Sequence, residues 1–245
     1  MVISHVLISR PQPEAAELAI LIKDTGLVPV ISPAFAFEPG FAGLEFGKVW
    51  PKGKRHLVIF CSPRAVEFGL RQLPAGFLDD VEIAAIGPAT ANCMESAGHS
   101  VSIIPDAGFD SESLLAHPAL LESPGKALIF AAPGGRQKIY SSLQERGWAV
   151  DFAHVYRAIP LPPEAGVMSS LQQSAGVLSI WTSENAMNHL SETISPGAWA
   201  EVCKGRFVVT SKRLAGKANS YAQDRVSVTD GPGNEAIMAC ILQLI

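Results

Sequence analysis

The sequence predicts an α/β fold built from two similar units, because strand and helix patterns occur twice in the same order and at nearly constant spacing. The apolar runs His5–Ile8 and Lys126–Ile129 each lead into a helical pattern that ends at a glycine, Gly26 or Gly147. Both the runs and the glycines are 121 positions apart (126 − 5 and 147 − 26). Two related surfaces form a cleft when they face each other, so we expect a ligand between them.

Two further pairs of segments extend the repeat. Leu57–Ala65 and Leu178–Ala186 are again 121 positions apart (178 − 57), and Ala84–Ala91 and Val208–Ala215 are 124 apart (208 − 84). Each segment has the pattern of a short apolar strand, a small polar or glycine-bearing turn and the start of a helix. This alternation predicts parallel sheets with helices on both faces, whose ligand-facing turns lie at the carboxyl ends of the strands.

Local signals justify the individual elements in chain order. Apolar residues recur at helical spacing between Pro13 and Gly26. Proline suits the first turn of a helix and glycine suits its end. Leu27–Ile31 is the next predicted strand. In the second copy, a helix through Tyr140–Leu143 is followed by the predicted strand Ala149–Ala153.

Two proline-flanked segments, Ser32–Pro39 and Val155–Pro163, are predicted to be extended because proline disfavours a helical conformation in the residue before it. A simple duplication would give one domain per repeat, divided near Ser123–Gly125. Crossings at the two extended segments would instead interleave the domains, and the prolines favour this path. The expected first domain is then 1–35 with 160–245, the second is 38–155, and the linkers lie near 34–39 and 156–162.

Composition excludes several classes of protein. The 245 residues carry a net charge of −4, whereas general nucleic-acid binding needs a basic surface. No apolar run approaches the ~20 residues of a membrane-spanning helix, and the first residues lack the pattern of a signal peptide. The four cysteines have neither C-x-x-C nor metal-ligand spacing, which is typical of reduced thiols in a cytosolic protein. We expect a cytoplasmic monomer that binds neither nucleic acid nor membrane.

Cofactor and nucleophile motifs fail on inspection. Gly231–Ala236 has the form G-x-G-x-x-A, but a dinucleotide fold needs a further strand and an acidic residue about 20 positions on. We interpret this segment as a helix entry, with Asp230 or Asn234 as the cap. The six histidines lack metal-ligand spacing, and Cys61 beside Ser62 is interpreted as a buried thiol. We expect no metal and no cofactor.

Five motifs together resemble the uroporphyrinogen-III synthase family, in that family's order and across essentially the whole chain. They are Phe60–Val66, Ile86–Ala91, Pro133–Arg136, Val155–Arg157 and Trp181–Ala186. The resemblance implies two flavodoxin-like domains joined by a two-stranded ladder, with the interleaved path. It also implies a lyase step without cofactor, in which the linear tetrapyrrole hydroxymethylbilane loses its hydroxyl and closes, with inversion of the last ring, to uroporphyrinogen III.

The implied substrate is rich in carboxylates and the protein is acidic, so local donors must provide the affinity. Four hydroxyl residues follow the ends of predicted strands, where free backbone N–H groups and the helix dipole favour an anion: Ser62, Thr90, Ser183 and Ser211. Each one is equally explained as a helix cap, and their recurrence favours a binding role. Thr182 adds a hydroxyl that the first copy replaces with Cys61.

Cations and glycines in the same turns are the other candidates for binding carboxylates. The cations are Arg10, Arg64, Arg136, Lys212 and Arg213. Charge-assisted hydrogen bonds suit them to this role, although a solvated surface position is the commoner one. Gly134 and Gly135 allow the backbone to approach a carboxylate closely, and an ordinary turn explains them equally.

Tyr156, in the second extended segment, is the candidate catalytic residue. Departure of hydroxide needs a donor that is protonated at neutral pH, and a phenol meets this requirement. In the family that the chain resembles, the tyrosine of this motif is the favoured candidate for assisting the departure, directly or through water. A linker aromatic packed on a domain edge is the alternative.

A second function class remains open at this point. A two-domain solute-binding or sensor module for an anionic small molecule would use the same hinge and the same helix N-termini. The product isomer formed from hydroxymethylbilane separates this module from the enzyme.

Overall fold

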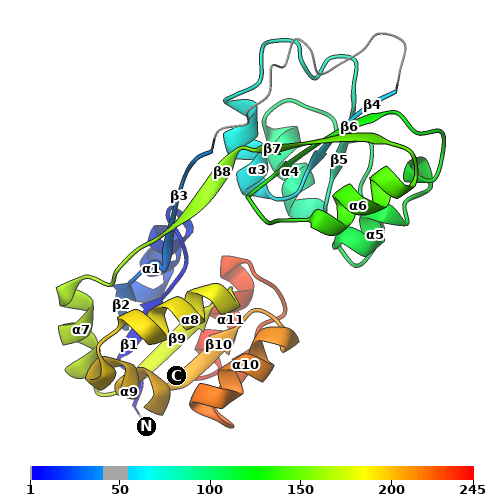
Figure 1. The fold of residues 1–245 in the computed structure, drawn as a ribbon. Coiled ribbons are helices and arrows are strands. Elements are labelled where there is room, and N and C mark those ends of the chain that lie inside the picture. The colour runs from blue at the N-terminus through cyan, green and yellow to red at the C-terminus, as the bar shows by residue number, and fades with distance from the viewer. Residues whose placement is uncertain (1, 41–54) are drawn as a thin grey trace. The chain divides into compact units, whose positions relative to one another are not determined.

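The computed structural model describes residues 2–40 and 55–245, which form two compact units with one main sheet each (Figure 1). Unit 1 consists of Met1–Ala36 and Ile159–Ile245, and unit 2 consists of Phe37–Ala158. The chain therefore starts in unit 1, builds unit 2 and returns. Both sheets are parallel and carry helices on both faces, which confirms the predicted fold class.

Unit 1 contains a five-stranded sheet in the order β11-β10-β9-β1-β2. Its strands are β1 (His5–Ile8), β2 (Val28–Ile31), β9 (Val177–Trp181), β10 (Arg206–Val209) and β11 (Val226–Val228). Its helices are α1 (Glu14–Lys23), α7 (Ala165–Gln172), α8 (Glu184–Thr193), α9 (Pro196–Lys204), α10 (Lys212–Ala222) and α11 (Asn234–Leu242). No helix among the described residues of the chain is long and apolar enough to cross a membrane.

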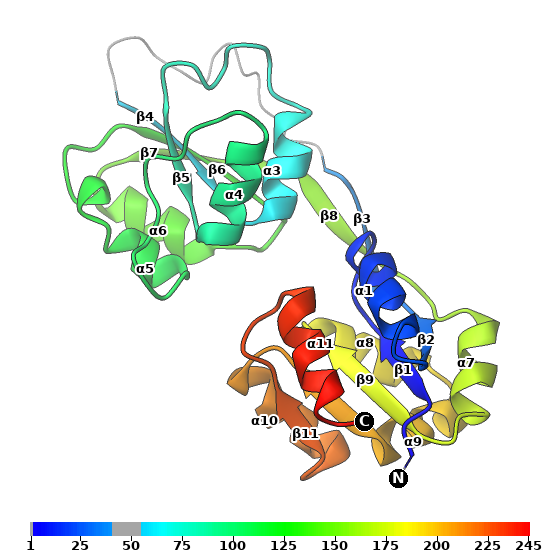
Figure 2. The ribbon, with the colours of Figure 1, turned by 180° about the vertical axis from the view of Figure 1, so that it is seen from behind.

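Helices cover both faces of this sheet (Figures 1 and 2). Leu7, Trp181 and Phe207 pack with α7 to α10 on one face, and Val6 and Ile8 pack with α1 and α11 on the other. A strand buried on both faces is mostly apolar, and all five residues of β9 are buried. Its one polar residue, Ser179, accepts a hydrogen bond from Trp181 Nε1 and donates one to the Arg206 carbonyl. Each large apolar side chain buried here contributes about 1.5–3 kcal/mol.

Unit 2 contains a four-stranded sheet in the order β5-β4-β6-β7. Its strands are β4 (His56–Phe60), β5 (Glu82–Ala85), β6 (Lys126–Ala131) and β7 (Ala149–His154). Its helices are α3 (Pro63–Leu70), α4 (Pro88–Ser96), α5 (Ser111–Leu115), the 3₁₀ helix Pro118–Leu120 and α6 (Gln137–Glu145). Helices α3 and α4 cover one face, and α5 and α6 cover the other.

The two sheets have equivalent strand orders. β6, β4 and β5 of unit 2 occupy the places of β1, β9 and β10 of unit 1. Ile103 forms an isolated parallel bridge with Ala84 of β5, at the place that β11 occupies in unit 1. Each unit therefore combines strands from both sequence repeats, in the flavodoxin-like order.

In this order the chain direction across the sheet reverses once, and ligands of such sheets bind outside the carboxyl ends of the two strands at that point. In unit 1 these strands are β1 and β9, with Ile8 level with Ile180. In unit 2 they are β4 and β6, with Phe60 level with Phe130. We refer to each place as the switch point of its unit.

A separate two-stranded sheet is formed by β3 (Phe35–Pro39) and β8 (Tyr156–Pro160), where the chain crosses between the units. Its ends are fixed by backbone hydrogen bonds. The N–H of Leu161 donates to the carbonyl of Ala34 at 2.9 Å, and that of Gly40 donates to Val155 at 2.8 Å. Both strands fall in the segments that were predicted to be extended.

Candidate active site

The switch point of unit 2 brings Tyr156 and Ser62 together. Ser62 follows β4 and is the N-cap of α3, where its Oγ accepts a hydrogen bond from the N–H of Ala65 at 3.0 Å. The Tyr156 hydroxyl lies 3.1 Å from the same Oγ. Two residues that are 94 positions apart thus meet at the carboxyl end of β4.

Aromatic packing fixes the Tyr156 ring. The ring stacks on Phe68 of α3 with centroids 5.8 Å apart, and Phe37 of β3 meets it edge-on at 5.6 Å. These ring contacts restrict the side chain and hold its hydroxyl at the strand end. When Ser62 donates in the shared hydrogen bond, the phenolic proton is free to be donated to a ligand.

The turn after β6 supplies a second group at this switch point. Gly134 has φ +74°, a left-handed conformation that favours glycine, and a side chain there would meet open space. Gly135 is tighter, because an added Cβ would lie 3.1 Å from the carbonyl oxygen of Ala132. Arg136 is itself left-handed (φ 59°, ψ 30°), and its Nη1 donates to Ser111 Oγ at 3.3 Å.

Cys61 is the buried thiol that the sequence predicted. Burial raises the pKa of this thiol to about 12, and the nearby Arg136 charge opposes the rise. The thiol is therefore neutral near pH 7 and unsuited to act as a nucleophile.

Thr90 lies in a different kind of position from the three serines. The N-cap of α4 is Gly87, and Thr90 is the third residue of the helix, only 2% exposed. Its hydroxyl makes no hydrogen bond with any residue in 2–40 or 55–245. Its repeat partner is Leu214 (214 − 90 = 124), which is also buried, so a packing role accounts for the position of Thr90.

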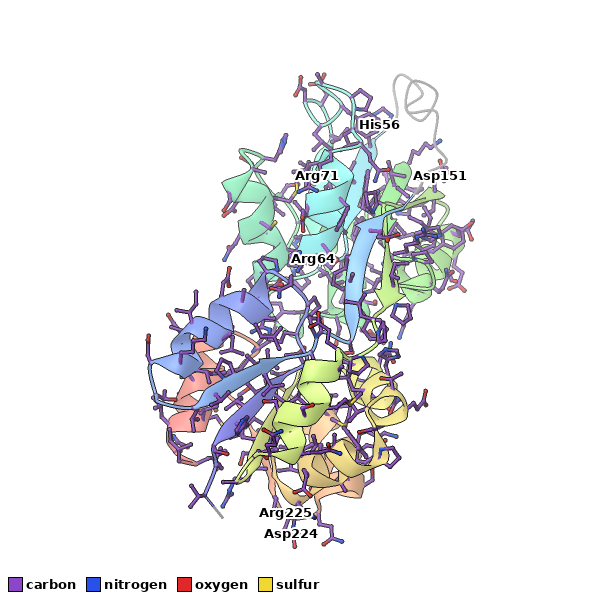
Figure 3. All side chains as sticks on the ribbon, turned by 90° about the vertical axis from the view of Figure 1, so that its left-hand side faces the viewer. His56, Arg64, Arg71, Asp151, Asp224 and Arg225 are labelled. Atoms are coloured by element: carbon purple, nitrogen blue, oxygen red, sulfur yellow. The ribbon has the colours of Figure 1, made fainter. Side chains whose placement is uncertain are left out.

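Arg64 contacts side chains close to it in the structure. This residue lies on α3 (Figure 3), its Nη1 is 2.8 Å from Glu67 Oε2, and its guanidinium sits 5.3 Å from the Phe37 ring centroid. A substrate carboxylate would have to compete with Glu67 for this charge.

In unit 1, Arg10 lies at the switch point just after β1. Its Nη1 donates to Asn234 Oδ1 at 2.6 Å. Burial lowers the pKa of the guanidinium, against the opposing effects of Glu14 and Glu17. Neither Asp230 nor Asn234 caps α11 as predicted, because the N-cap is Gly233 and the Asn234 side chain bonds Arg10 and Glu17 instead.

Two serines cap helices at the carboxyl edge of the unit 1 sheet. Ser183 accepts from the N–H of Ala186 at 3.4 Å, and Ser211 accepts from that of Leu214 at 3.3 Å. Thr182 precedes Ser183 and is half-buried. These positions match Ser62 of unit 2, since all three begin a helix directly after a central strand.

Lys212 and Arg213 are exposed in the first turn of α10. Arg213 is 3.6 Å from Glu184, and its side chain is 79% exposed. A pair this exposed contributes about 0–1 kcal/mol, so it does not fix the position of the cation.

The sequence reasoning missed the residues that hold the two arginines. Ser111 and Asn234 are the first residues of α5 and α11, and their separation (234 − 111 = 123) is close to the repeat offset of that region. This spacing could have identified Ser111 and Asn234 as corresponding residues from the sequence alone. Ser9 was also missed. It follows β1, is 2% exposed and donates to the carbonyl of Ile180 at 2.7 Å, which joins the two strands at the switch point.

The described residues contain no group of three or more His, Cys, Asp or Glu side chains that could hold a metal ion. What the strand ends offer instead is a set of hydroxyls, arginines and helix N-termini. Two flavodoxin-like units define a class of two-domain α/β proteins, and turns of this kind at strand ends can bind anionic groups.

The chain belongs to the uroporphyrinogen-III synthase family: a sequence profile of the family described as "Uroporphyrinogen-III synthase HemD" matches residues 16–239. The family activity is the cyclisation of hydroxymethylbilane to uroporphyrinogen III, a lyase step of haem and tetrapyrrole biosynthesis. This membership confirms the resemblance and disfavours the solute-binding alternative.

Full-length relatives agree with this assignment. Uroporphyrinogen-III synthase of Escherichia coli is 26% identical over 243 residues, covering 96% of this chain and 99% of the relative. The enzyme of Salmonella typhimurium is 27% identical over 255 residues, with the same coverage of both.

Solved structures share the fold. Uroporphyrinogen III synthase of the extremely thermophilic bacterium Thermus thermophilus, as a mutant, has a TM-score of 0.63 at 18% identity and covers 98% of both chains. The uroporphyrinogen-III synthetase of Helicobacter pylori also has a TM-score of 0.63, at 15% identity, covering 99% of this chain and 100% of that one.

Proposed function

We propose that this chain closes hydroxymethylbilane at the strand-end turns described above, with Tyr156 assisting the departure of the hydroxyl. The observation that carries the proposal is the 3.1 Å contact between Tyr156 and Ser62 at the switch point of unit 2. This contact supports the proposal because it holds the phenol at a strand end, the part of an open parallel sheet where ligands bind.

The reaction requires from the protein a proton donor for the leaving hydroxyl and groups that hold the substrate. The C–O bond of the terminal hydroxymethyl group breaks as the adjacent pyrrole nitrogen supplies electron density, and the bonding electron pair leaves with oxygen. A proton or hydrogen bond from Tyr156, directly or through water, turns the leaving group into water. The last ring then bonds to the hydroxymethyl carbon through its substituted α-position, and the bond from that position to the neighbouring bridge breaks. The bridge rejoins the ring at its free α-position, and the proton lost there offsets the one taken up by the leaving group; these steps invert the ring and give uroporphyrinogen III.

The remaining turns are proposed to bind the substrate carboxylates. Arg10 and Arg136 offer charge-assisted hydrogen bonds, and the helices that begin at Ser62, Ser183 and Ser211 present N–H groups and the positive end of the dipole. Thr182, Gly134 and Gly135 flank these groups. Arg64, Thr90, Lys212 and Arg213 remain part of the proposal, with the ion pairs of Arg64 and Arg213 and the packing of Thr90 opposing it.

The working unit is proposed to be a cytoplasmic monomer. Support for a reducing compartment comes from four cysteines that are all free thiols. We further propose that residues 1–35 with 160–245 and residues 38–155 are separate domains joined by linkers near 34–39 and 156–162. The described division of the chain into two compact units supports these boundaries.

The decisive experiment is the variant Tyr156→Phe, assayed with freshly generated hydroxymethylbilane and scored by product isomer. Removal of the hydroxyl leaves the stacking on Phe68, so the fold should persist. We expect kcat to fall by about 10- to 100-fold with little change in KM, in line with general-acid assistance. A turnover within about twofold of the parent, less than ~0.5 kcal/mol, shows that Tyr156 is only a packing residue of the linker.

A further inference from the structure

An arginine held by the first residue of a helix occurs once in each unit. In unit 1, Arg10 Nη1 donates to Asn234 Oδ1 at 2.6 Å. In unit 2, Arg136 Nη1 donates to Ser111 Oγ at 3.3 Å. Asn234 begins α11 and Ser111 begins α5.

The two pairs occupy equivalent places in the fold. Arg10 follows β1 and Arg136 follows β6, which are corresponding switch-point strands. Helices α11 and α5 correspond too, since each follows the outermost strand position and packs beside the helix after the switch-point strand. The turn after β6 is longer, so Arg136 comes five residues after its strand and Arg10 two. The contact recurs although the turns differ.

Both arginines are hydrogen-bonded to neutral groups. Their hydrogen-bond partners are a neutral amide and a neutral hydroxyl, and neither forms an ion pair with a described residue. Arg55 and Arg64, in contrast, pair with Glu82 and Glu67. A half-buried guanidinium that is oriented by a neutral acceptor retains donors and positive charge for an anion.

The electrostatic surroundings differ between the units. Glu14 and Glu17 act on Arg10 from α1 without reaching ion-pair distance, and Glu17 Oε2 accepts from Asn234 Nδ2 at 3.4 Å. Arg136 interacts with Asp110 at the N-cap of α5. In unit 1 the Asn234 amide bonds both Arg10 and Glu17, and in both units the guanidinium is directed by a hydrogen bond to a neutral group.

We propose that Asn234 and Ser111 are positioning residues that aim Arg10 and Arg136 so that each binds one substrate carboxylate. The inference rests on the proposed function, because it assumes that the substrate lies at the strand ends. Ser111 has a second task in unit 2, since Arg136 has a left-handed backbone conformation that is unfavourable for a non-glycine residue, and the hydrogen bond helps to hold its side chain.

The experiment measures KM and kcat for hydroxymethylbilane in two double-variant comparisons. Arg136→Ala, Ser111→Ala and the double variant form one set, and Arg10→Ala, Asn234→Ala and their double variant form the other. We expect each single variant to raise KM by about 5- to 20-fold with kcat nearly unchanged. Each double variant should match its arginine variant, because a positioning residue has no effect once its arginine is gone.

Controls separate positioning from loss of structure. Arg225→Ala removes an arginine near the start of β11 (Figure 3) that donates to backbone carbonyls, and Ser141→Ala removes an exposed hydroxyl on α6. Both should keep the parent KM. Ser111→Thr retains the hydroxyl and should restore most of the affinity that Ser111→Ala loses. Thermal unfolding identifies any variant that fails to fold. The set of variants in the other unit then tests the positioning role.

The outcomes distinguish failure of the proposed carboxylate site from failure of the positioning role. Arginine variants with the parent KM would overturn the proposed carboxylate site itself. Arginine variants with raised KM beside Asn234→Ala and Ser111→Ala variants of normal KM would leave that site standing and refute the positioning role. Independent, multiplicative effects in the double variants would also refute it.

Discussion

The Ser62→Ala substitution separates the two tasks of one hydroxyl. In the structure Ser62 Oγ accepts the N–H of Ala65 at 3.0 Å and shares a 3.1 Å hydrogen bond with Tyr156. Loss of the cap should lower the free energy of unfolding by about 1 kcal/mol. For a chain of this length that corresponds to a fall in Tm of about 2–4 °C.

The same substitution should slow the reaction. A net hydrogen bond is worth about 0.5–1.5 kcal/mol, so losing the partner that orients the phenol should lower kcat by about 2- to 12-fold. The effect should vanish in the Tyr156→Phe background, because there is then no hydroxyl left to orient.

The chain supplies matched controls. Ser183→Ala and Ser211→Ala delete the same kind of cap from α8 and α10, and no tyrosine hydroxyl contacts either serine in the described part of the chain. These two variants should lose similar stability and shift KM rather than kcat.

Steady-state kinetics with scored product isomer and a thermal melt decide the matter. If Ser62→Ala loses stability but keeps the parent kcat, as its controls should, then the Ser62–Tyr156 contact is structural and does not orient the phenol for the reaction.

Three other predictions rest on burial and chain path. Thr90→Val should leave Tm nearly unchanged, because the residue is buried and valine keeps its volume, and it should raise KM if the hydroxyl binds a carboxylate; native kinetics would leave Thr90 as a packing residue. Cys61 should resist iodoacetamide at pH 8 in the folded enzyme, because its raised pKa of about 12 keeps it protonated there, whereas the unfolded chain should react; mass spectrometry that finds rapid native labelling contradicts this. Hydrogen exchange in increasing denaturant should show protection lost in two cooperative groups that divide near Ala36 and Ala158, and a single group spanning both would count against separate domains.

Much of the fold could be predicted because strands buried on both faces carry mostly apolar runs. Ala127–Ala131 is such a run, Val177–Trp181 is interrupted only by Ser179, and the constant offset between repeats identified their partners. The strand order is harder to read, since it depends on which segments cross between the units. Apart from the family resemblance, the prolines in the crossing segments gave the sequence signal for that path.

The site was predictable in its residue types but not in its contacts. Helix caps are local, so Ser62, Ser183 and Ser211 could be expected to begin helices from the sequence alone. The contact of Ser62 with Tyr156 is not local, and pattern reasoning cannot provide it. Arg64 shows the opposite error, because Glu67 three residues on could have been recognised as its partner.

The repeat itself explains why one unit would carry the proposed chemistry. Ser62 and Ser183 correspond at the 121-residue offset (183 − 62), and by the same offset Tyr156 corresponds to Phe35 (156 − 35). Phe35 packs 5.4 Å from the His189 ring, and a phenylalanine has no hydroxyl to offer. The groups suited to carboxylates, in contrast, are present in both copies, with Arg10 and Asn234 matching Arg136 and Ser111. A substrate with many carboxylates but a single leaving group calls for this division: binding groups in duplicate, and the proton donor once.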